Sequence, residues 1–318
     1  MLLLILFLLS LMVLATRIAS LLHEGLGHAL PVVLLGGAVR SVELSLFGGG
    51  WVNYTRPPGG GAAGAFLVAY GGILVNLALG FLCLALVRRV AKTTFVSSLL
   101  IMSGMVNVLG ALAYLILGLY YDWGDPAGGA AGRAWWAPLL VLSPAAAWLA
   151  ARPYAVLQES IFPRSTAPGR VVVAMRTLGV AGALYTGLFF VTEGRLVSAE
   201  APRAARERSV EEARQRKIEA VAAGIRRAHP DFPEDRVRRE AATTPVVVRP
   251  EEVPSRFPLI PVLALLLAAG GVAALATVKP GESVPAASPL RFPSRRTVAL
   301  ATGLAALVLG GIYLGTSH

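Results

Sequence analysis

Two histidines and a glutamate lie close together in the first apolar segment, where His23-Glu24 is followed by Gly25-Leu26-Gly27-His28. The apolar run around them extends from Leu2 to about Leu35. Ionisable groups at membrane depth are costly unless they are paired or bound to a metal ion. Two histidines on one helix face, with a glutamate beside the first, are typical ligands and general base of a catalytic zinc ion. The stretch therefore predicts zinc ligation by His23 and His28, with Glu24 as the base.

The spacing of the histidines sets a condition on the helix that carries them. Ligands four residues apart differ by about 40° around an α-helix, whereas positions five apart, as here, differ by about 140°. A π-bulge, with its i→i+5 hydrogen bond, would bring His28 back under His23. Gly25 and Gly27 favour that distortion because neither has a Cβ atom. The hexapeptide resembles the zinc-binding H-E-x-x-x-H motif of the dipeptidyl peptidase III family, which uses this longer spacing.

A third ligand must come from another segment, because a catalytic zinc ion takes three protein ligands and a water molecule. Asp122 and Asp125 are the only acids between Glu43 and Glu159, and they follow the third apolar span. The first and third spans cross the membrane in the same direction, so their C-terminal ends reach the same side. Either aspartate can therefore meet the histidines, or both are ordinary acids of a solvated loop.

The composition indicates the class of protein that holds these residues. Apolar residues make up 55% of the 318, charged residues only 15%, and the mean hydropathy is +0.66. Segments near the roughly 20 residues that a membrane helix needs occur at 2–35, 61–87, 95–119, 134–151, 171–191, 259–278 and 298–314. The sequence predicts an all-α polytopic membrane protein with six or seven transmembrane helices. The fourth segment is the least regular, because Pro138 and Pro144 interrupt it.

The basic residues point to a membrane rather than to nucleic acid. The net charge is +11, but 14 of the 29 Lys and Arg residues lie between Arg195 and Arg256, together with most of the acids. The remaining excess lies mainly in short loops, where it favours contact with lipid headgroups. The single cysteine, Cys83, lies in a span and excludes an intrachain disulfide.

Residues 39–54 predict a β-hairpin between the first two spans. Val42, Leu44 and Leu46 alternate with other residues, and a glycine turn then leads into Trp51-Val52-Asn53-Tyr54. Two interpretations remain open: an interfacial loop anchored by its aromatic residues, or an edge strand that pairs with an extended substrate.

Polar and small residues inside the second and third spans are further candidates for the site. Gly71 and Gly72 are consistent with close helix packing. Asn76 follows them in the same span and Asn107 lies in the third span. A buried amide needs partners, and beside a metal site it can orient a ligand, a water molecule or a substrate carbonyl.

The chain is expected to have four parts. Residues 1–151 form a membrane-embedded core with four spans and the hairpin, and residues 152–198 add a span. Residues 199–256, rich in Arg, Glu and Ala, predict a charged helical segment outside the membrane. Residues 257–318 form a C-terminal pair of helices.

Taken in order, these motifs resemble the site-2 protease superfamily of intramembrane zinc metalloproteases, especially its compact bacterial members. The resemblance covers about residues 1–150. It implies that His23, His28 and Asp125 bind zinc and that Glu24 is the base. Asp125 is favoured over Asp122 because Gly-Asp125-Pro-Ala is similar to the family's Ser/Gly-Asp-Ala. The family's Gly-Pro-x-x-Asn motif is similar to Gly71-Gly72-Ile-Leu-Val-Asn76, with glycine replacing proline. Asn107 is similar to the asparagine of the family's Asn-x-x-Pro motif.

The resemblance implies a protease of a prokaryotic plasma membrane, with one Zn²⁺ per chain, that cuts peptide bonds in or next to transmembrane segments. Its partners would be membrane lipids and a transmembrane protein or peptide substrate. The longer motif also suits an inactive pseudoprotease that acts as a membrane-assembly factor. A third hypothesis is a transporter-like subunit in which His23, Glu24 and Asn76 line a polar pathway.

Overall fold

The structure of the chain is a computed structural model that describes residues 1–55, 57, 60–90, 94–121, 124–126, 135–162, 166–246, 259–279, 282 and 292–316. Two compact units are present, Met1–Arg195 with Leu259–His318, and Leu196–Pro258. In the described ranges, seven helical segments are long and apolar enough to cross a membrane. Helices suit this setting because they satisfy their own backbone hydrogen bonds where water is absent. The predicted class, an all-α polytopic membrane protein with a small hairpin, is confirmed.

Two of the spans combine α-helix with a π-helical turn. The first span is continuous but changes type, from α1 (Leu2–Leu22) through the π-helix η1 (His23–Ala29) to α2 (Leu30–Leu34). The fifth span, Ala167–Thr192, also contains a π-helical turn. The remaining bounds are α3 (Gly61–Val90), α4 (Thr94–Tyr121), α6 (Trp136–Ile161), α7 (Ala167–Ala174), η2 (Met175–Gly179), α8 (Val180–Ala228), α9 (Glu234–Thr243), α10 (Leu259–Ala276) and α11 (Arg295–Thr316).

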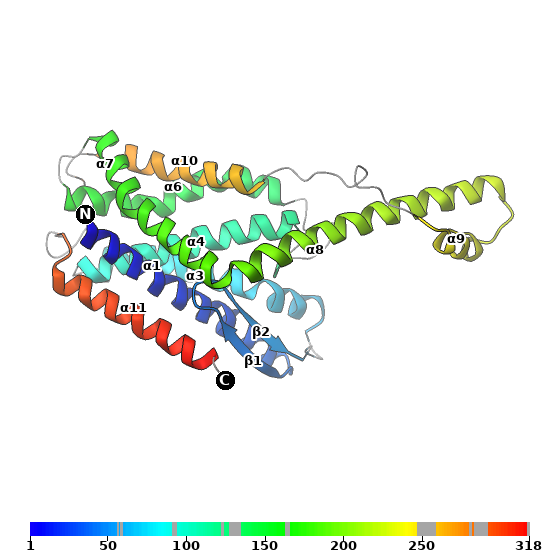
Figure 1. Cartoon of the computed structure of the whole chain (residues 1–318), viewed down its shortest axis with the longest axis horizontal. Coiled ribbons are helices and arrows are strands. Elements are labelled where there is room, and N and C mark those ends of the chain that lie inside the picture. The colour runs from blue at the N-terminus through cyan, green and yellow to red at the C-terminus, as the bar shows by residue number, and fades with distance from the viewer. Residues whose placement is uncertain are drawn as a thin grey trace. The chain divides into compact units, whose positions relative to one another are not determined.

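The fourth span, predicted over residues 134–151, is longer than predicted and is a continuous helix. Pro144 and Pro153 lie inside α6, and the apolar segment continues to Glu159 rather than stopping near Ala151. Neighbouring helices make such prolines tolerable in a membrane. Here α10 runs alongside α6 (Figure 1), and its Gly270 lies so close to the Pro144 carbonyl oxygen that a Cβ atom would overlap it.

The main core of the first unit lies between α1, α4 and α6. Phe7 and Leu11 of α1 and Ile101 of α4 are almost completely buried there. α11 packs along α1 (Figure 1), and the hydroxyl groups of Ser10 and Thr302 lie 3.1 Å apart between these two helices. α1 is therefore enclosed on several sides, which fixes the segment that leads into the histidines.

The hairpin consists of β1 (Val39–Leu44) and β2 (Gly50–Tyr54), paired antiparallel. A bulge interrupts the register between Val39 and Ser41. The hairpin lies beside the C-terminal part of the first span (Figure 1) and contacts η1. The hairpin predicted over about residues 39–54 is confirmed.

The second unit has a small core of its own. Val237 and Ala241 of α9 are buried with Ala222 of α8, and Glu234 pairs with Arg226 and Arg238 at the surface. Residues 247–256 of the predicted charged segment lie outside the described residues. The four predicted domain ranges stay predictions.

The π-helix η1 confirms the distortion that the histidine spacing predicts. The Leu30 N–H donates to the Gly25 carbonyl oxygen, five residues earlier. Pro31, which has no N–H, follows at once in α2. Gly27 of η1 is pressed against α3, where a Cβ atom would overlap the backbone of Gly72. The turn is therefore held by a contact between glycine backbones as well as by its own hydrogen bonds.

Replacing Gly27 with alanine should separate η1 from α3 and lower the free energy of unfolding by about 1–3 kcal/mol, because the added methyl group meets backbone that cannot move aside freely. Thermal unfolding of the full chain in detergent measures this. Gly25→Ala is the matched control, since a Cβ atom at Gly25 has nothing within 4 Å. Equal losses from the two substitutions would contradict the close contact.

Candidate metal centre

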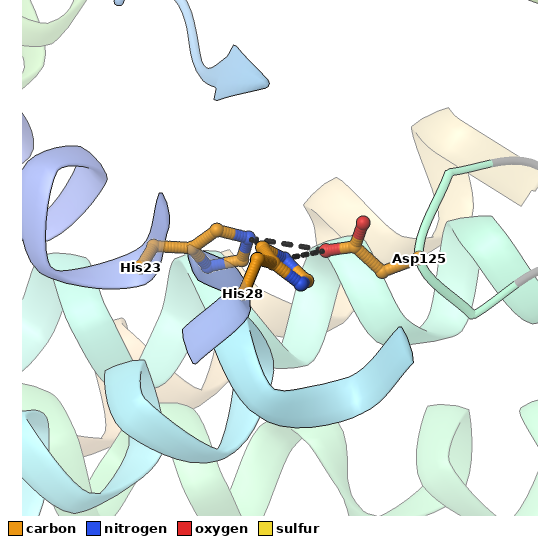
Figure 2. A group of neighbouring side chains, drawn as sticks. All are labelled: His23, His28 and Asp125. Atoms are coloured by element: carbon orange, nitrogen blue, oxygen red, sulfur yellow. Dashed lines mark hydrogen bonds and ion pairs between the residues drawn. The ribbon is translucent and has the colours of Figure 1, made fainter. Parts of the chain in front are cut away.

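Three side chains meet where η1 faces the turn that follows α4 (Figure 2). The Nε2 atoms of His23 and His28 each lie 3.1 Å from Oδ2 of Asp125. The two Nε2 atoms lie 3.2 Å from each other. Although five residues separate the histidines in sequence, the π-helical turn brings both rings to one side.

The triangle formed by these three atoms suits a small tetrahedral cation. Zinc ligands at about 2.0–2.2 Å from the ion are about 3.4 Å apart in a tetrahedron, close to the 3.1 and 3.2 Å separations here. Two imidazoles and a carboxylate are also a common ligand set for catalytic zinc, and they leave the fourth position for water. His23, His28 and Asp125 could therefore hold one zinc ion.

The imidazole of His28 is oriented by the backbone of α3. Its Nδ1 atom lies 2.6 Å from the Val68 carbonyl oxygen, so Nδ1–H donates and Nε2 is left with its lone pair towards the site. Metal-binding histidines are commonly oriented in this way. His28 is also buried, with 6% of its surface exposed.

The imidazole of His23 lies against α3 at Gly72. A Cβ atom at Gly72 would overlap this ring, and one at Gly71 would overlap the Gly27 carbonyl oxygen. Both glycines therefore act by allowing close approach. His23 Nδ1 is buried without a hydrogen-bond partner among the described residues.

Asp125 carries a full negative charge beside the histidines. Burial of Asp125 acts to raise the pKa of its carboxyl group, but its close contact with the imidazoles of His23 and His28 outweighs burial and lowers this pKa to about 2. The carboxylate is consequently ionised at neutral pH, which is the form that binds metals. The alternative ligand Asp122 lies outside the described residues.

Glu24 lies beside the triad and faces the hairpin. It is buried, with 5% exposed, and its Cγ would be 2.8 Å from a Cβ atom placed on Gly50 of β2. No hydrogen bond or ion pair joins Glu24 to another residue in the described ranges. Its carboxylate is therefore not committed to a structural partner in that part of the chain.

The two predicted asparagines belong to the helices next to the triad. Asn76 is one turn beyond Gly72 on α3, and its side-chain oxygen is buried without a partner. Asn107 of α4 donates to the Ser103 carbonyl oxygen at 2.8 Å, and its own oxygen is also buried and unpaired. Within the described ranges, neither amide bonds to the triad, and their orienting role stays a prediction.

A buried arginine holds the hairpin and was not predicted as part of the site. Arg17 of α1 is 3% exposed and donates hydrogen bonds to the carbonyl oxygens of Ser45 and Gly48. Tyr185 of α8 donates to the Phe47 carbonyl oxygen at 2.7 Å and lies 3.3 Å from Arg17. Among the described residues, no carboxylate pairs with Arg17. In the sequence, Arg17 could have been noticed as a lone charged residue inside an apolar span.

Comparison of the chain with models of known protein families, with curated proteins and with solved structures gives no match.

Replacing Arg17 with methionine should loosen the turn at residues 45–49, because two backbone carbonyl groups lose a buried donor at about 1–3 kcal/mol. Amide hydrogen exchange in this turn and in β2 should then rise about 10- to 100-fold. Arg40→Met is the control, since Arg40 belongs to the same hairpin and its side chain is exposed. If both substitutions speed exchange equally, Arg17 does not hold the hairpin.

Proposed function

We propose that this protein is an intramembrane zinc metalloprotease that hydrolyses peptide bonds in or next to transmembrane segments, as its resemblance to site-2 proteases implies. The observation that carries the proposal is the convergence of His23, His28 and Asp125 beside an uncommitted Glu24. This convergence joins residues about 100 positions apart, and it needs a helix type that is rare elsewhere.

The proposed zinc ion would be held by His23, His28 and Asp125, one ion per chain. When bound, it would polarise the scissile carbonyl group and lower the pKa of a water molecule to about 7. Glu24 would accept a proton at its carboxylate and return it to the leaving amine. Such general acid-base transfer contributes about 10²–10⁴ in rate.

The hairpin would hold the substrate in the form that a protease cuts. A transmembrane helix protects its carbonyl groups with hydrogen bonds, so it must unwind locally before cleavage. The two-stranded sheet can pair with an extended segment at an edge. Because Gly50 of β2 lies against Glu24, a segment paired with the hairpin would pass close to the proposed base.

The placement of the site supports a substrate that comes from the membrane. His23, Glu24 and His28 lie within the first apolar span, Leu2–Leu34, while Asp125 lies just beyond the third, Thr94–Tyr121. We therefore infer a site near one face of the membrane, reached by transmembrane proteins or peptides within surrounding lipid. From the resemblance to compact bacterial proteases, we propose that this membrane is the plasma membrane of a prokaryotic cell.

Purified protein should contain about one zinc ion per chain, and His23→Ala should lose it. A co-expressed single-span substrate should be cut by the wild type. Glu24→Gln should keep zinc while cleavage falls about 10²–10⁴-fold, because only proton transfer is removed.

Cleavage that persists in Glu24→Gln would exclude the proposed base. Zinc binding without any cleavage would instead indicate a pseudoprotease, and absence of zinc would favour a transporter-like subunit.

Gly50→Ala should lower the cleavage rate about 10²-fold without loss of zinc. The new methyl group would meet the Glu43 carbonyl oxygen and the side chains of Glu24 and Leu44, and the Glu24 side chain would be displaced from its position. Gly49→Ala is the control, since a Cβ atom at Gly49 meets nothing within 4 Å. Rates are measured on the same single-span substrate. Full activity in Gly50→Ala would show that the contact between β2 and Glu24 has no role in catalysis.

A further inference from the structure

Two tyrosine hydroxyl groups from different helices bind the turn that carries Asp125. The Asp125 N–H donates to the Tyr114 hydroxyl oxygen of α4 at 3.1 Å. The Tyr70 hydroxyl of α3 donates to the Pro126 carbonyl oxygen at 3.3 Å. A backbone N–H outside regular structure needs an acceptor when it is buried. Tyr114 supplies that acceptor at the residue that carries the carboxylate.

The contact between Tyr114 and the turn is also tight. Gly124 has a φ of +67°, and a Cβ atom there would overlap the Tyr114 hydroxyl and lie 2.9 Å from its Cζ atom. Only a residue without a side chain fits this conformation and this space easily. The turn is therefore pressed onto the end of the tyrosine side chain rather than merely linked to it.

Tyr114 touches both halves of the proposed zinc site. Its ring packs edge-to-face against the His23 imidazole, with 6.3 Å between ring centroids. Tyr70 directly precedes Gly71 and Gly72, the residues on which η1 and the His23 ring rest. One short segment of α3 and one residue of α4 thus set the histidines and Asp125 relative to each other.

We propose that Tyr114 is a positioning residue that sets the Asp125 carboxylate for metal binding, with Tyr70 supporting the same turn. The inference rests on the proposed zinc site. Tyr114 acts through Asp125, and its own hydroxyl is not a ligand. Partners that orient ligands in this way contribute about 10- to 100-fold to metal affinity.

Tyr114→Phe in the full chain should therefore weaken zinc binding about 10- to 100-fold, measured by competition with a chelator. Tyr70→Phe should weaken it less, because Tyr70 binds the residue after the ligand. The control is Tyr120→Phe on the same helix, whose ring packs against Trp136. The thermal stability of the zinc-free protein should change little in Tyr114→Phe, which separates positioning from a general loss of fold.

The decisive comparison uses Asp125→Ala as a background. If Tyr114 acts through Asp125, then Tyr114→Phe has no further effect on zinc affinity once the carboxylate is gone. If Tyr114→Phe lowers zinc affinity by the same factor in both backgrounds, or in neither, the inference is overturned while the zinc site itself stands. A wild-type chain that binds no zinc would overturn the proposed function and this inference together.

A second pair of variants tests the contact from the side of the turn, should Tyr114→Phe fold poorly. Gly124→Ala pushes against the Tyr114 hydroxyl and should weaken zinc binding. Gly110→Ala, on the same helix as Tyr114, places its methyl group in open space and should not. Equal zinc affinity in these two variants would also overturn the proposed role of Tyr114.

Discussion

The i→i+5 turn at His23–Ala29 is the constraint on which the rest of the candidate site depends. A regular α-helix would place His23 and His28 about 140° apart, and no single ion could bind both. The turn is held by the close approach of Gly27 to α3, so the bundle enforces a helix geometry that is rare on its own. The packing of Gly27 against α3 therefore also determines whether His23 and His28 can bind one ion.

Charge inside the apolar bundle is handled in two different ways. At the site, the imidazoles of His23 and His28 lie against the Asp125 carboxylate, each with its Nε2 atom 3.1 Å from Oδ2. Arg17 instead sits among backbone carbonyl oxygens of the hairpin turn. The same arginine thereby ties the hairpin to the first span, close to Glu24. Both charged groups contact a segment that the proposed chemistry uses.

Features with a local signature were predictable from the sequence. Hydropathy located the spans, alternation located the hairpin, and the histidine spacing required the π-bulge. The shared direction of the first and third spans brought Asp122 and Asp125 to the side of the histidines, and only the resemblance to site-2 proteases favoured Asp125. Contacts across helices were not predictable in this way: nothing near Tyr114 indicates that its hydroxyl accepts from Asp125. Likewise, Pro144 made the fourth segment irregular in the sequence, and its position inside α6 against Gly270 of α10 is a contact between helices that the sequence does not reveal.

X-ray absorption of the zinc-loaded protein tests the central claim most directly. The chain has four histidines, so replacing His229 and His318 with glutamine leaves only His23 and His28. Two imidazole ligands on zinc are expected, with nitrogen and oxygen atoms at about 2.0–2.2 Å and no sulfur. A spectrum with one imidazole or none, or with sulfur from Cys83, would contradict it.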